Sequence, residues 1–341
     1  MIQVLSTYPF DVSVIVTSYN TRDLVRECLQ SLAEECLRLP GGLHAEIILI
    51  DDCSKDGTIE MVEAEFSASE VPVRFFRNSV NLGFGGANNA GMEKALGKYI
   101  LLLNSDAFLH PGSLYRAIQK MDASPDVGIG GAKLVSRDGG WQPSARQFPS
   151  LWNDAITMTG LAARFPKSRI FGAPDRTWAD PDEAADVDWV PGAFFLLRRE
   201  ALAKTGLFDP IFFIYLEEVD LCRRIKQAGY RVSYWPDVVV THIGGETAKQ
   251  NKSQLFSGSG SQVVLWRLRS TFLYYRKTHG WKAWQIYAFE TVFYNLRRLR
   301  NLVSFDLERR QKAGEWVRML AVIRQAWSDT EGGRVCPPRP W

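Results

Sequence analysis

Short apolar runs alternate with amphipathic segments of helical length over the first hundred residues, and this alternation constrains the fold more than any other feature. The apolar runs are residues 12–18, 46–51, 73–76 and 99–104. The segments between them predict helices over 22–38, from Thr58 onward and over 87–96. Continuous apolar runs are typical of strands buried on both faces. The pattern therefore predicts an α/β fold: a mostly parallel sheet with right-handed crossovers, flanked by helices.

Polar residues follow these runs at the points where the predicted strands end. They are Thr17, Ser18, Tyr19 and Asn20 after the first run, Asp51 and Asp52 after the second, and Asn104, Ser105 and Asp106 after the fourth. In open α/β sheets, ligands bind at the carboxyl ends of the parallel strands. We therefore expect a binding site at this edge.

The segment 135–187 has little periodicity and is rich in Pro, Trp and Arg, which predicts loops and short helices over the edge of the sheet. The pattern resumes in WVPGAFFLLRRE (189–200), a helix expected over 217–228 and a strand within 230–242. We expect one domain over 1–255, with a first half at about 1–135 and a second half at about 136–255.

The chain changes character from Ser261 onward, after a Ser/Gly stretch (257–261) that predicts a hinge. Residues 261–341 contain fifteen Lys and Arg against six Asp and Glu, although the whole chain has 41 against 38. Aromatic and basic residues interleave there at helical spacing. We expect a helical extension over 261–330 and a tail over 331–341. The extension could lie on an anionic membrane, or could pack as a helical cap or a homodimer interface. No nucleic-acid-binding motif accompanies it.

Five scattered cysteines without metal-ligand spacing predict reduced thiols and a cytoplasmic protein. The sequence has neither a signal-peptide pattern nor an apolar stretch long enough to span a bilayer. We expect at most a peripheral contact with the inner face of the cell membrane.

Three groups of residues could carry chemistry. Asp106 leaves a buried strand, and with His242 it could hold a hard divalent cation, Mg²⁺ or Mn²⁺. The Gly- and Asn-rich segment 81–91 predicts a loop that enters a helix, where backbone amides can approach an anion. Glu217, Glu218 and Asp220 follow the apolar IFFIYL, and a partly buried carboxylate has the raised pKa of a general base. Each pattern also has a structural explanation. His242 could be a structural histidine at a strand end, the segment 81–91 could be an ordinary turn, and the acids could simply favour the start of a helix.

Taken together, these motifs resemble a known family. VSVIVTSYN, IDDCSKDGT, NLGFGGANNAG, LLLNSDA, DWVPGAFFLLRRE and FDPIFFIYLEEVDLCRRIKQAGYRVSYWPDVVVTHIGG are similar, in this order, to the family-2 glycosyltransferases of GT-A fold. The likeness covers about residues 11–245 and is strongest to the rhamnosyltransferase branch that builds bacterial cell-surface glycans. It implies a glycosyltransferase of cell-envelope polysaccharide synthesis that uses a nucleoside-diphosphate sugar, with dTDP-rhamnose favoured and UDP- or GDP-sugars as alternatives.

The resemblance also implies that 1–255 is a catalytic domain, with its nucleotide-binding half at about 1–135 and its acceptor half at about 136–255. It further implies roles for individual residues. Thr17, Tyr19 and Asp52 would contact the base and ribose, and Asn20 and Ser105 would join them on the donor side. The donor pocket would be lined by Asn81, Gly83, Phe84 and Asn88. Trp189 and Gly192 would lie on the acceptor side. Asp106 and His242 would bind the metal, and Glu218 would be the base that activates a hydroxyl of a glycan or polyprenyl-diphosphate-linked acceptor, with inversion.

Two positions depart from the family pattern. Asn104 stands where the metal motif has its first acid, and Glu218 stands where the family usually has Asp, so that Glu217 or Asp220 could be the base instead. The extra methylene shifts a carboxylate by roughly 1 Å, which matters for attack geometry. Two other functions remain open: a sugar-nucleotide nucleotidyltransferase, and a non-catalytic glycan- or membrane-binding module on the same scaffold.

Overall fold

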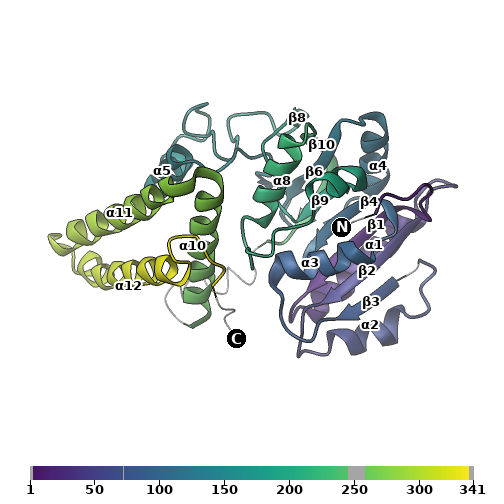
Figure 1. Ribbon diagram of the computed structural model, residues 1–341, viewed down its shortest axis with the longest axis horizontal. Coiled ribbons are helices and arrows are strands. Elements are labelled where there is room, and N and C mark those ends of the chain that lie inside the picture. The colour runs from purple at the N-terminus through teal and green to yellow at the C-terminus, as the bar shows by residue number, and fades with distance from the viewer. Residues whose placement is uncertain (1–2, 72, 245–257, 338–341) are drawn as a thin grey trace. The chain divides into compact units, whose positions relative to one another are not determined.

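The computed structural model describes residues 3–71, 73–244 and 258–337, which belong to two compact units (Figure 1). The first unit comprises Met1–Asp209 and Glu218–Gly244, and the second comprises Pro210–Glu217 and Gly245–Trp341. The chain therefore leaves the first unit for eight residues just before Glu218 and then returns to it.

The first unit is built on one ten-stranded sheet. Its strands are β1 (Phe10–Ser18), β2 (Ala45–Asp51), β3 (Val73–Arg77), β4 (Gly97–Asn104), β5 (Ala107–Leu109), β6 (Val127–Val135), β7 (Trp141–Gln142), β8 (Ala185–Asp186), β9 (Phe194–Arg198) and β10 (Arg231–His242). Their order is β3-β2-β1-β4-β9-β6-β10-β5, with β7 beside β6 and β8 beside β10. The first four strands are mutually parallel, whereas β9 runs antiparallel between β4 and β6. The predicted α/β fold with a mostly parallel sheet is confirmed.

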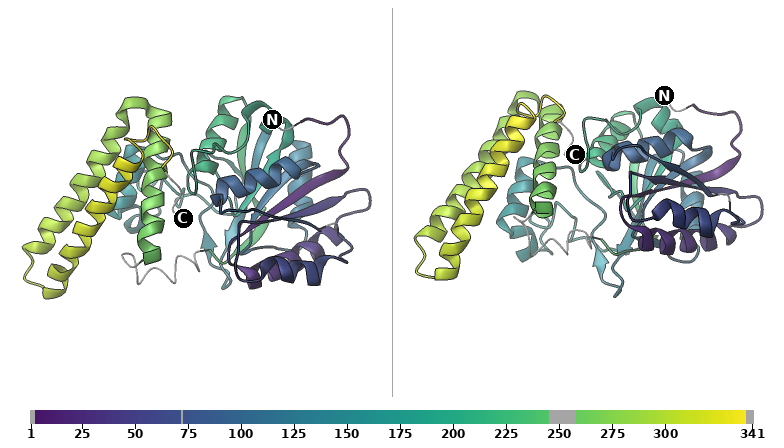
Figure 2. Two further views of the ribbon diagram at one scale, coloured as in Figure 1. Left: turned by 60° about the horizontal axis from the view of Figure 1, so that its bottom comes forward. Right: turned by 90° about the horizontal axis from the view of Figure 1, so that it is seen from below.

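Helices cover both faces of this sheet (Figure 2). The helices of this unit are α1 (Arg22–Leu37), α2 (Thr58–Phe66), α3 (Gly83–Lys94), α4 (Ser113–Ala123), α5 (Leu151–Thr159), α6 (Leu161–Arg164), α7 (Arg199–Thr205) and α8 (Glu217–Gln227). The apolar side chains of α1, α2 and α4 pack in one core cluster, and those of α3, α7 and α8 pack in the other. Alternate residues of β1 enter the two clusters, Val14 and Val16 on one face and Ile15 on the opposite face. This explains why the strands have continuous apolar sequences.

One predicted boundary is wrong. The helix expected over 87–96 is α3, which begins at Gly83 and ends at Lys94, so most of the expected Gly-rich loop is helical. Close packing explains the glycines, because a Cβ at Gly91 would come within 2.5 Å of Ile15. Without side chains at such positions, the helix backbone can approach the sheet directly.

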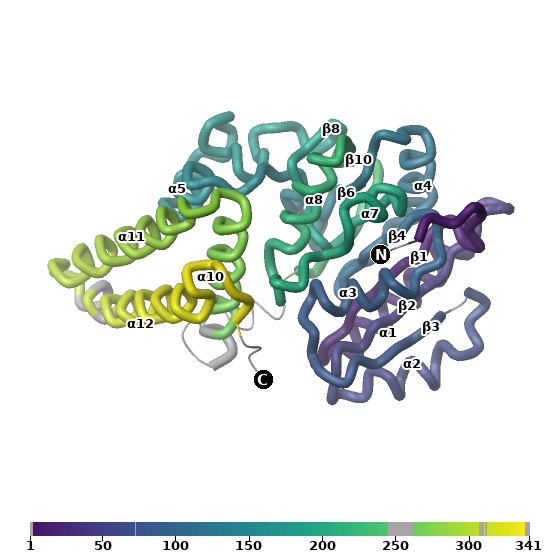
Figure 3. The backbone as a smooth tube through the Cα atoms, in the orientation of Figure 1, coloured from purple at the N-terminus to yellow at the C-terminus, as the bar shows by residue number. Residues whose placement is uncertain are grey.

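The second unit contains three long helices, α10 (Gly258–His279), α11 (Trp284–Leu302) and α12 (Leu307–Asp329), with a 3₁₀ turn η2 (Gly280–Ala283) before α11 (Figure 3). Their shared core is aromatic. Trp327 stacks on Tyr287 with ring centroids 4.6 Å apart and meets the edge of Phe272 at 5.2 Å. At the same end of the bundle, Arg269 Nε donates a hydrogen bond to Asp329 Oδ2 at 3.1 Å.

The Ser/Gly stretch expected to be a hinge is helical from Gly258, where α10 begins, and its first residue, Ser257, lies outside the described residues. A search of the described ranges for a helix with the length and apolarity to cross a bilayer found none.

Candidate functional site

The ends of β1, β2 and β4 meet at one edge of the sheet because the strands are parallel and in register. Ser18 pairs with Asp51, and Thr17 pairs with both Ile50 and Asn104. The polar residues that follow each strand therefore emerge side by side, as their positions in the sequence predict.

Hydrogen bonds join the loops that leave these three strands. The Asn20 backbone amide donates to Ser54 Oγ at 2.9 Å, and Lys55 N donates to Asn20 Oδ1 at 2.8 Å. The hydroxyls of Thr21 and Ser105 lie 3.2 Å apart. Thr17 is partly accessible, and Tyr19 is 45% exposed. The Tyr19 ring is thus available to a ligand, whereas Asn20 holds two loops together.

Asp52 is buried and is bound by its own chain. Its carboxylate accepts hydrogen bonds from Leu82 N (2.9 and 3.0 Å), Gly83 N (3.0 Å) and Asn78 Nδ2 (2.8 Å). Burial raises the pKa of Asp52 above its usual value, although the hydrogen bonds from these donors lower it in part. The amides at the start of α3 are therefore partly satisfied by a carboxylate, which is the favourable charge at a helix N-terminus.

The residues expected to line the donor pocket lie at the start of α3. Asn81 Oδ1 accepts a hydrogen bond from Gly83 N at 2.9 Å, and Asn88 Nδ2 donates to Phe84 O at 2.9 Å. Asn81 and Asn88 are both buried, with 7% and 1% of their surface exposed. These amides fix the backbone around Phe84 instead of pointing freely to solvent.

The loop before β9 lies against both β4 and α3. Asn104 N donates to Ala193 O at 3.4 Å, and a Cβ added to Gly192 would come within 2.6 Å of the Phe84 ring. On α8, Cys222 is buried in the same apolar cluster as Val190 of this loop. The loop therefore connects the tip of β4, the start of α3 and α8.

Glu218 lies one turn before Cys222 on the same face of α8. Burial raises the pKa of the Cys222 thiol, and the negative charge of Glu218 raises it further. Glu218 Oε2 is buried and has no hydrogen-bond partner among the described residues. Burial raises the pKa of Glu218, while its own backbone amide and the positive charge of Arg146 act in the opposite direction. A raised pKa suits a carboxyl group to accept a proton during a reaction.

The other two acids of the cluster differ from Glu218. Asp220 Oδ2 accepts a hydrogen bond from Arg224 Nε at 2.8 Å, and Arg224 also donates to the carbonyls of Thr205 and Leu207. Asp220 therefore anchors the loop after α7. Glu217 is 2% exposed and belongs to the stretch grouped with the second unit.

The backbone immediately before this cluster is strained. Tyr215 and Leu216 both have left-handed conformations, with φ of 72° and 68°. Asn20 and Cys53, in the loops after β1 and β2, are also left-handed, at 54° and 70°. A non-glycine residue in this region costs on the order of 1–3 kcal/mol, and such strain clusters at functional sites.

Asp106 and His242 are brought together by the antiparallel pairing of β5 with β10, in which His242 is opposite Ala107. Asp106 Oδ1 lies 3.4 Å from His242 Nε2, and Asp106 Oδ2 accepts a hydrogen bond from Gly244 N at 3.2 Å. The two side chains are separated by more than a hundred residues in the sequence, so this contact depends on the sheet.

Gln142 determines which nitrogen of His242 carries the proton. Gln142 Nε2 donates to the His242 carbonyl at 2.9 Å, which leaves Gln142 Oε1 facing His242 Nδ1 at 3.1 Å. Since Oε1 can only accept, Nδ1 must be the donor. In neutral His242 the lone pair of Nε2 then faces the Asp106 carboxylate, and two acceptors face each other across 3.4 Å.

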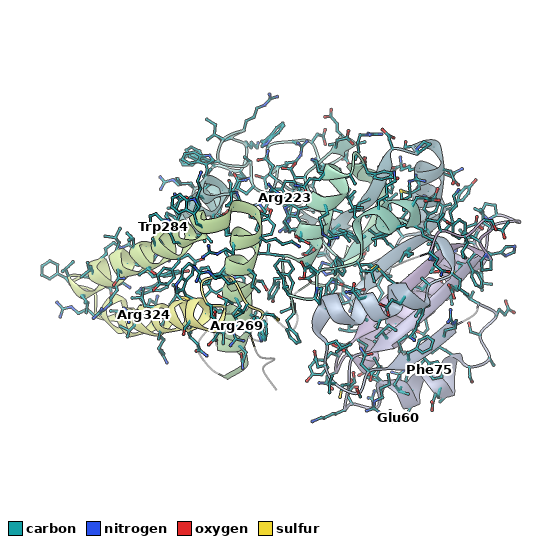
Figure 4. The ribbon with its side chains drawn as sticks, viewed as in Figure 1. Glu60, Phe75, Arg223, Arg269, Trp284 and Arg324 are labelled. Atoms are coloured by element: carbon teal, nitrogen blue, oxygen red, sulfur yellow. The ribbon has the colours of Figure 1, made fainter. Side chains whose placement is uncertain are left out.

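Arg146 links this pair to Glu218 through a short stretch of chain. It lies four residues after Gln142, and its guanidinium lies over the Trp189 ring, 5.0 Å from the centroid. Trp189 Nε1 donates to Gln147 O at 2.8 Å. On α8, Arg223, labelled in Figure 4, lies over Phe148 at 5.6 Å. The segment 142–148 thus runs from the Asp106–His242 pair to α8.

Comparison with known proteins identifies the family that has these motifs. The family model described as glycosyl transferase family 2 matches residues 13–206, more than half of the chain. The chain belongs to glycosyl transferase family 2. The predicted family membership is confirmed, and the protein is a glycosyltransferase.

Two relatives of this family-2 glycosyltransferase are named as rhamnosyltransferases. It is 28% identical over 249 residues to N-acetylglucosaminyl-diphospho-decaprenol L-rhamnosyltransferase of Mycobacterium tuberculosis, covering 70% of this chain and 77% of the relative. It is 26% identical over 275 residues to rhamnosyltransferase WbbL of Escherichia coli K12, covering 77% and 92%.

Solved structures show the GT-A fold. A mannosyltransferase from Pyrobaculum calidifontis, in complex with GDP-Man and Mn²⁺, aligns with a TM-score of 0.54 at 17% identity, covering 96% of this chain and 91% of that one. GalNAc-T7 with UDP, GalNAc and Mn²⁺ aligns with a TM-score of 0.55 at 18% identity, covering 94% of this chain and 57% of that one. The expected GT-A fold with C-terminal helices is confirmed.

Sequence reasoning missed Gln142, Arg146 and Asn78 in this glycosyltransferase. The first two lie in the aperiodic segment 135–187, where no pattern distinguishes them from other loop residues. Their importance depends on their neighbours in space. Gln142 contacts His242, whereas Arg146 contacts Trp189 and, against the effect of burial, lowers the pKa of Glu218 through its charge.

Proposed function

We propose that this glycosyltransferase moves a sugar, with rhamnose favoured, from a nucleoside-diphosphate donor to a hydroxyl group of a glycan or polyprenyl-diphosphate-linked glycan, with inversion at the anomeric carbon. The observation that carries the proposal is Glu218, a half-buried residue with a buried Oε2 and a raised pKa, beside the loop that reaches Phe84 and Asn104. The names of the rhamnosyltransferase relatives support the sugar and the lipid-linked acceptor.

In the proposed reaction, Glu218 takes the proton from the acceptor hydroxyl as the oxygen attacks the anomeric carbon. The new bond from oxygen to carbon forms while the bond to the phosphate oxygen breaks. The electron pair leaves with the nucleoside diphosphate. Attack from the face opposite the leaving group inverts the configuration, and the raised pKa allows Glu218 to hold the proton after transfer.

Asp106 and His242 fit a divalent metal such as Mg²⁺ or Mn²⁺. Two acceptor atoms, Asp106 Oδ1 and His242 Nε2, face each other at 3.4 Å and could both bind one cation. Gln142 holds the imidazole as partners of metal-binding histidines do. No cluster of three or more His, Cys, Asp or Glu that could hold a metal occurs in the described ranges, so phosphates and water would complete the shell. A bound metal would neutralise charge on the leaving diphosphate.

The donor side would be formed by the loops at the strand ends. Tyr19 is accessible there beside Thr17, while Asn20, Asp52, Asn81 and Asn88 hold the surrounding backbone. We favour dTDP-rhamnose as the donor, with UDP- and GDP-sugars as the alternatives. Trp189 and Gly192 would line the acceptor side.

The test has a binding arm and a turnover arm. Thermal shifts with dTDP-, UDP- and GDP-sugars and Mn²⁺ should identify the donor, since a ligand at about 100 times its Kd stabilises by about 2.7 kcal/mol. Glu218→Gln should then lower kcat roughly 10²–10⁴-fold and leave the donor shift intact. Glu63→Gln, an exposed change on α2, is the matched control. Full turnover by Glu218→Gln would refute this role.

A sugar-nucleotide nucleotidyltransferase would instead release pyrophosphate from a nucleoside triphosphate and a sugar phosphate. Measurement of the released product, nucleoside diphosphate or pyrophosphate, separates the two reactions. A non-catalytic binding module would bind a glycan and release neither product.

A further inference from the structure

We propose that the outward face of α11 is a docking surface for a bilayer that contains anionic phospholipids. The α11 face consists of large apolar side chains that remain exposed: Trp284, Val292, Leu296, Leu299 and Leu302, with Trp281 before the helix and Val303 and Phe305 after it. The inference deepens the proposed function, because it names the surface at which a lipid-linked acceptor would be presented.

The α11 face is continuous along the helix. Trp284, Val292, Leu296 and Leu299 repeat at intervals of three, four or eight residues, which places them on one side at 3.6 residues per turn. Their exposed fractions are 47%, 57%, 61% and 56%. From Trp284 to Leu302 the stripe extends about 27 Å at 1.5 Å per residue. A stripe of this length suits a helix lying flat in the interface better than one inserted by its tip.

The exposed face is not the side of α11 that packs in the helical bundle, because the opposite side of α11 forms that packing. Ile286 is fully buried, and Tyr287 stacks on Trp327 of α12. Further along, Tyr294 lies 5.6 Å from Trp316, and the Arg297 guanidinium covers the same indole. The aromatic and basic residues of this segment thus divide into an inward set that holds the bundle and an outward set with no core to join.

Within α11, charged side chains lie beside the apolar stripe and not on it, and the exposed acid Asp306 comes after the helix. The polar residues among its apolar side chains, Gln285 and Asn295, are uncharged. Helical spacing puts Arg298 on one border of the face and Arg300 on the other, and exposed Lys282 precedes the helix. The one acid of α11, Glu290, is 5% exposed on the inward side. Basic side chains on the borders of an apolar stripe can reach phosphate groups while the apolar residues enter the acyl boundary.

Charge complementarity favours lipid over a second copy of this chain. A two-fold interface through the α11 face would bring the same basic borders of two copies together, and like charges across an interface are unfavourable. α12 adds the exposed basic residues Lys312 and Arg324, the latter labelled in Figure 4 with Trp284. An anionic bilayer satisfies both the apolar face and its basic borders.

Vesicle flotation of the full chain tests the proposal without substrate. The wild type should float with vesicles of phosphatidylcholine mixed with phosphatidylglycerol and bind phosphatidylcholine alone more weakly. Leu296→Glu/Leu299→Glu should lower the partition coefficient at least tenfold, because both leucines would enter the interface. Arg298→Gln/Arg300→Gln should lose about fivefold per arginine, with anionic vesicles only.

The matched control is Leu37→Glu/Ile170→Glu, which places the same charges at apolar residues of the first unit that are 59% and 58% exposed. This control should float like the wild type. Equal flotation of Leu296→Glu/Leu299→Glu and the wild type would overturn the proposal. A lipid-free dimer that the same variant dissociates, in a chain that binds no vesicles, would assign the face to a second copy and also overturn it. None of these outcomes depends on sugar transfer, so failure here leaves the proposed reaction standing.

Discussion

Gln142 holds His242 at two points, donating to its carbonyl at 2.9 Å and accepting from its Nδ1 at 3.1 Å. The geometry directs Nε2 toward Asp106. The same amide therefore fixes both the backbone at the end of β10 and the orientation of the ring.

Replacing Gln142 should weaken metal binding without removing a ligand. Gln142→Ala is expected to lower Mn²⁺ affinity roughly 10–100-fold, the usual effect of losing a partner that orients a metal-binding histidine. Titration of Mn²⁺ by electron paramagnetic resonance measures the affinity directly. Gln119→Ala, a change at a residue bonded only to Tyr115 in the described structure, is the control. Unchanged affinity in Gln142→Ala would count against Asp106 and His242 as the metal site.

Glu218→Gln should stabilise the fold at high pH even as it lowers turnover. The folded-state pKa of Glu218 is raised above its ordinary 4.5, so the folded chain holds this proton more tightly than the unfolded chain does. That contribution to stability is fully present below pH 4.5 and is lost as pH rises through the raised pKa. Urea unfolding should show Glu218→Gln more stable than wild type at pH 8, with the difference shrinking as pH falls. A constant difference across this range would contradict the prediction.

Arg146 should control the pH dependence of catalysis through its charge. Its positive charge lowers the pKa of Glu218 against the effect of burial. Arg146→Gln should therefore raise that pKa and move the acidic limb of the kcat/KM profile to higher pH. Arg146→Lys keeps the charge and should leave the limb near its wild-type position. Equal displacement by both substitutions would indicate a structural effect on Trp189 instead.

Gly192 should be required for the position of Phe84. A Cβ there would lie 2.6 Å from the Phe84 ring, so Gly192→Ala must displace the ring. We expect donor affinity to fall by about tenfold, the scale of a 1.4 kcal/mol loss. Phe84→Leu in the Gly192→Ala background should recover part of it by making room. Gly314→Ala, where a Cβ meets nothing within 4 Å, is the control. Failure of the second substitution to recover any affinity would contradict this steric account.

The sequence alone predicted the parallel part of the sheet and the edge at which we propose that the ligand binds. Local periodicity predicts strands and helices, and the carboxyl ends of parallel strands lie at one edge of a sheet. Thr17, Asp52 and Asn104 could therefore be placed together without coordinates. The start of α3 was misplaced, because glycines that permit close packing on Ile15 have the same sequence pattern as a flexible loop.

Tertiary structure decided the rest. The approach of Asp106 to His242 follows from the register of β5 on β10, and no local pattern encodes that register. The pKa of Glu218 depends on burial and on Arg146, which come from distant segments. The basic aromatic segment showed helical spacing, but its sequence could not say which residues pack on Trp327 and which stay exposed. Local periodicity is a property of neighbours along the chain, whereas desolvation and charge proximity are properties of neighbours in space.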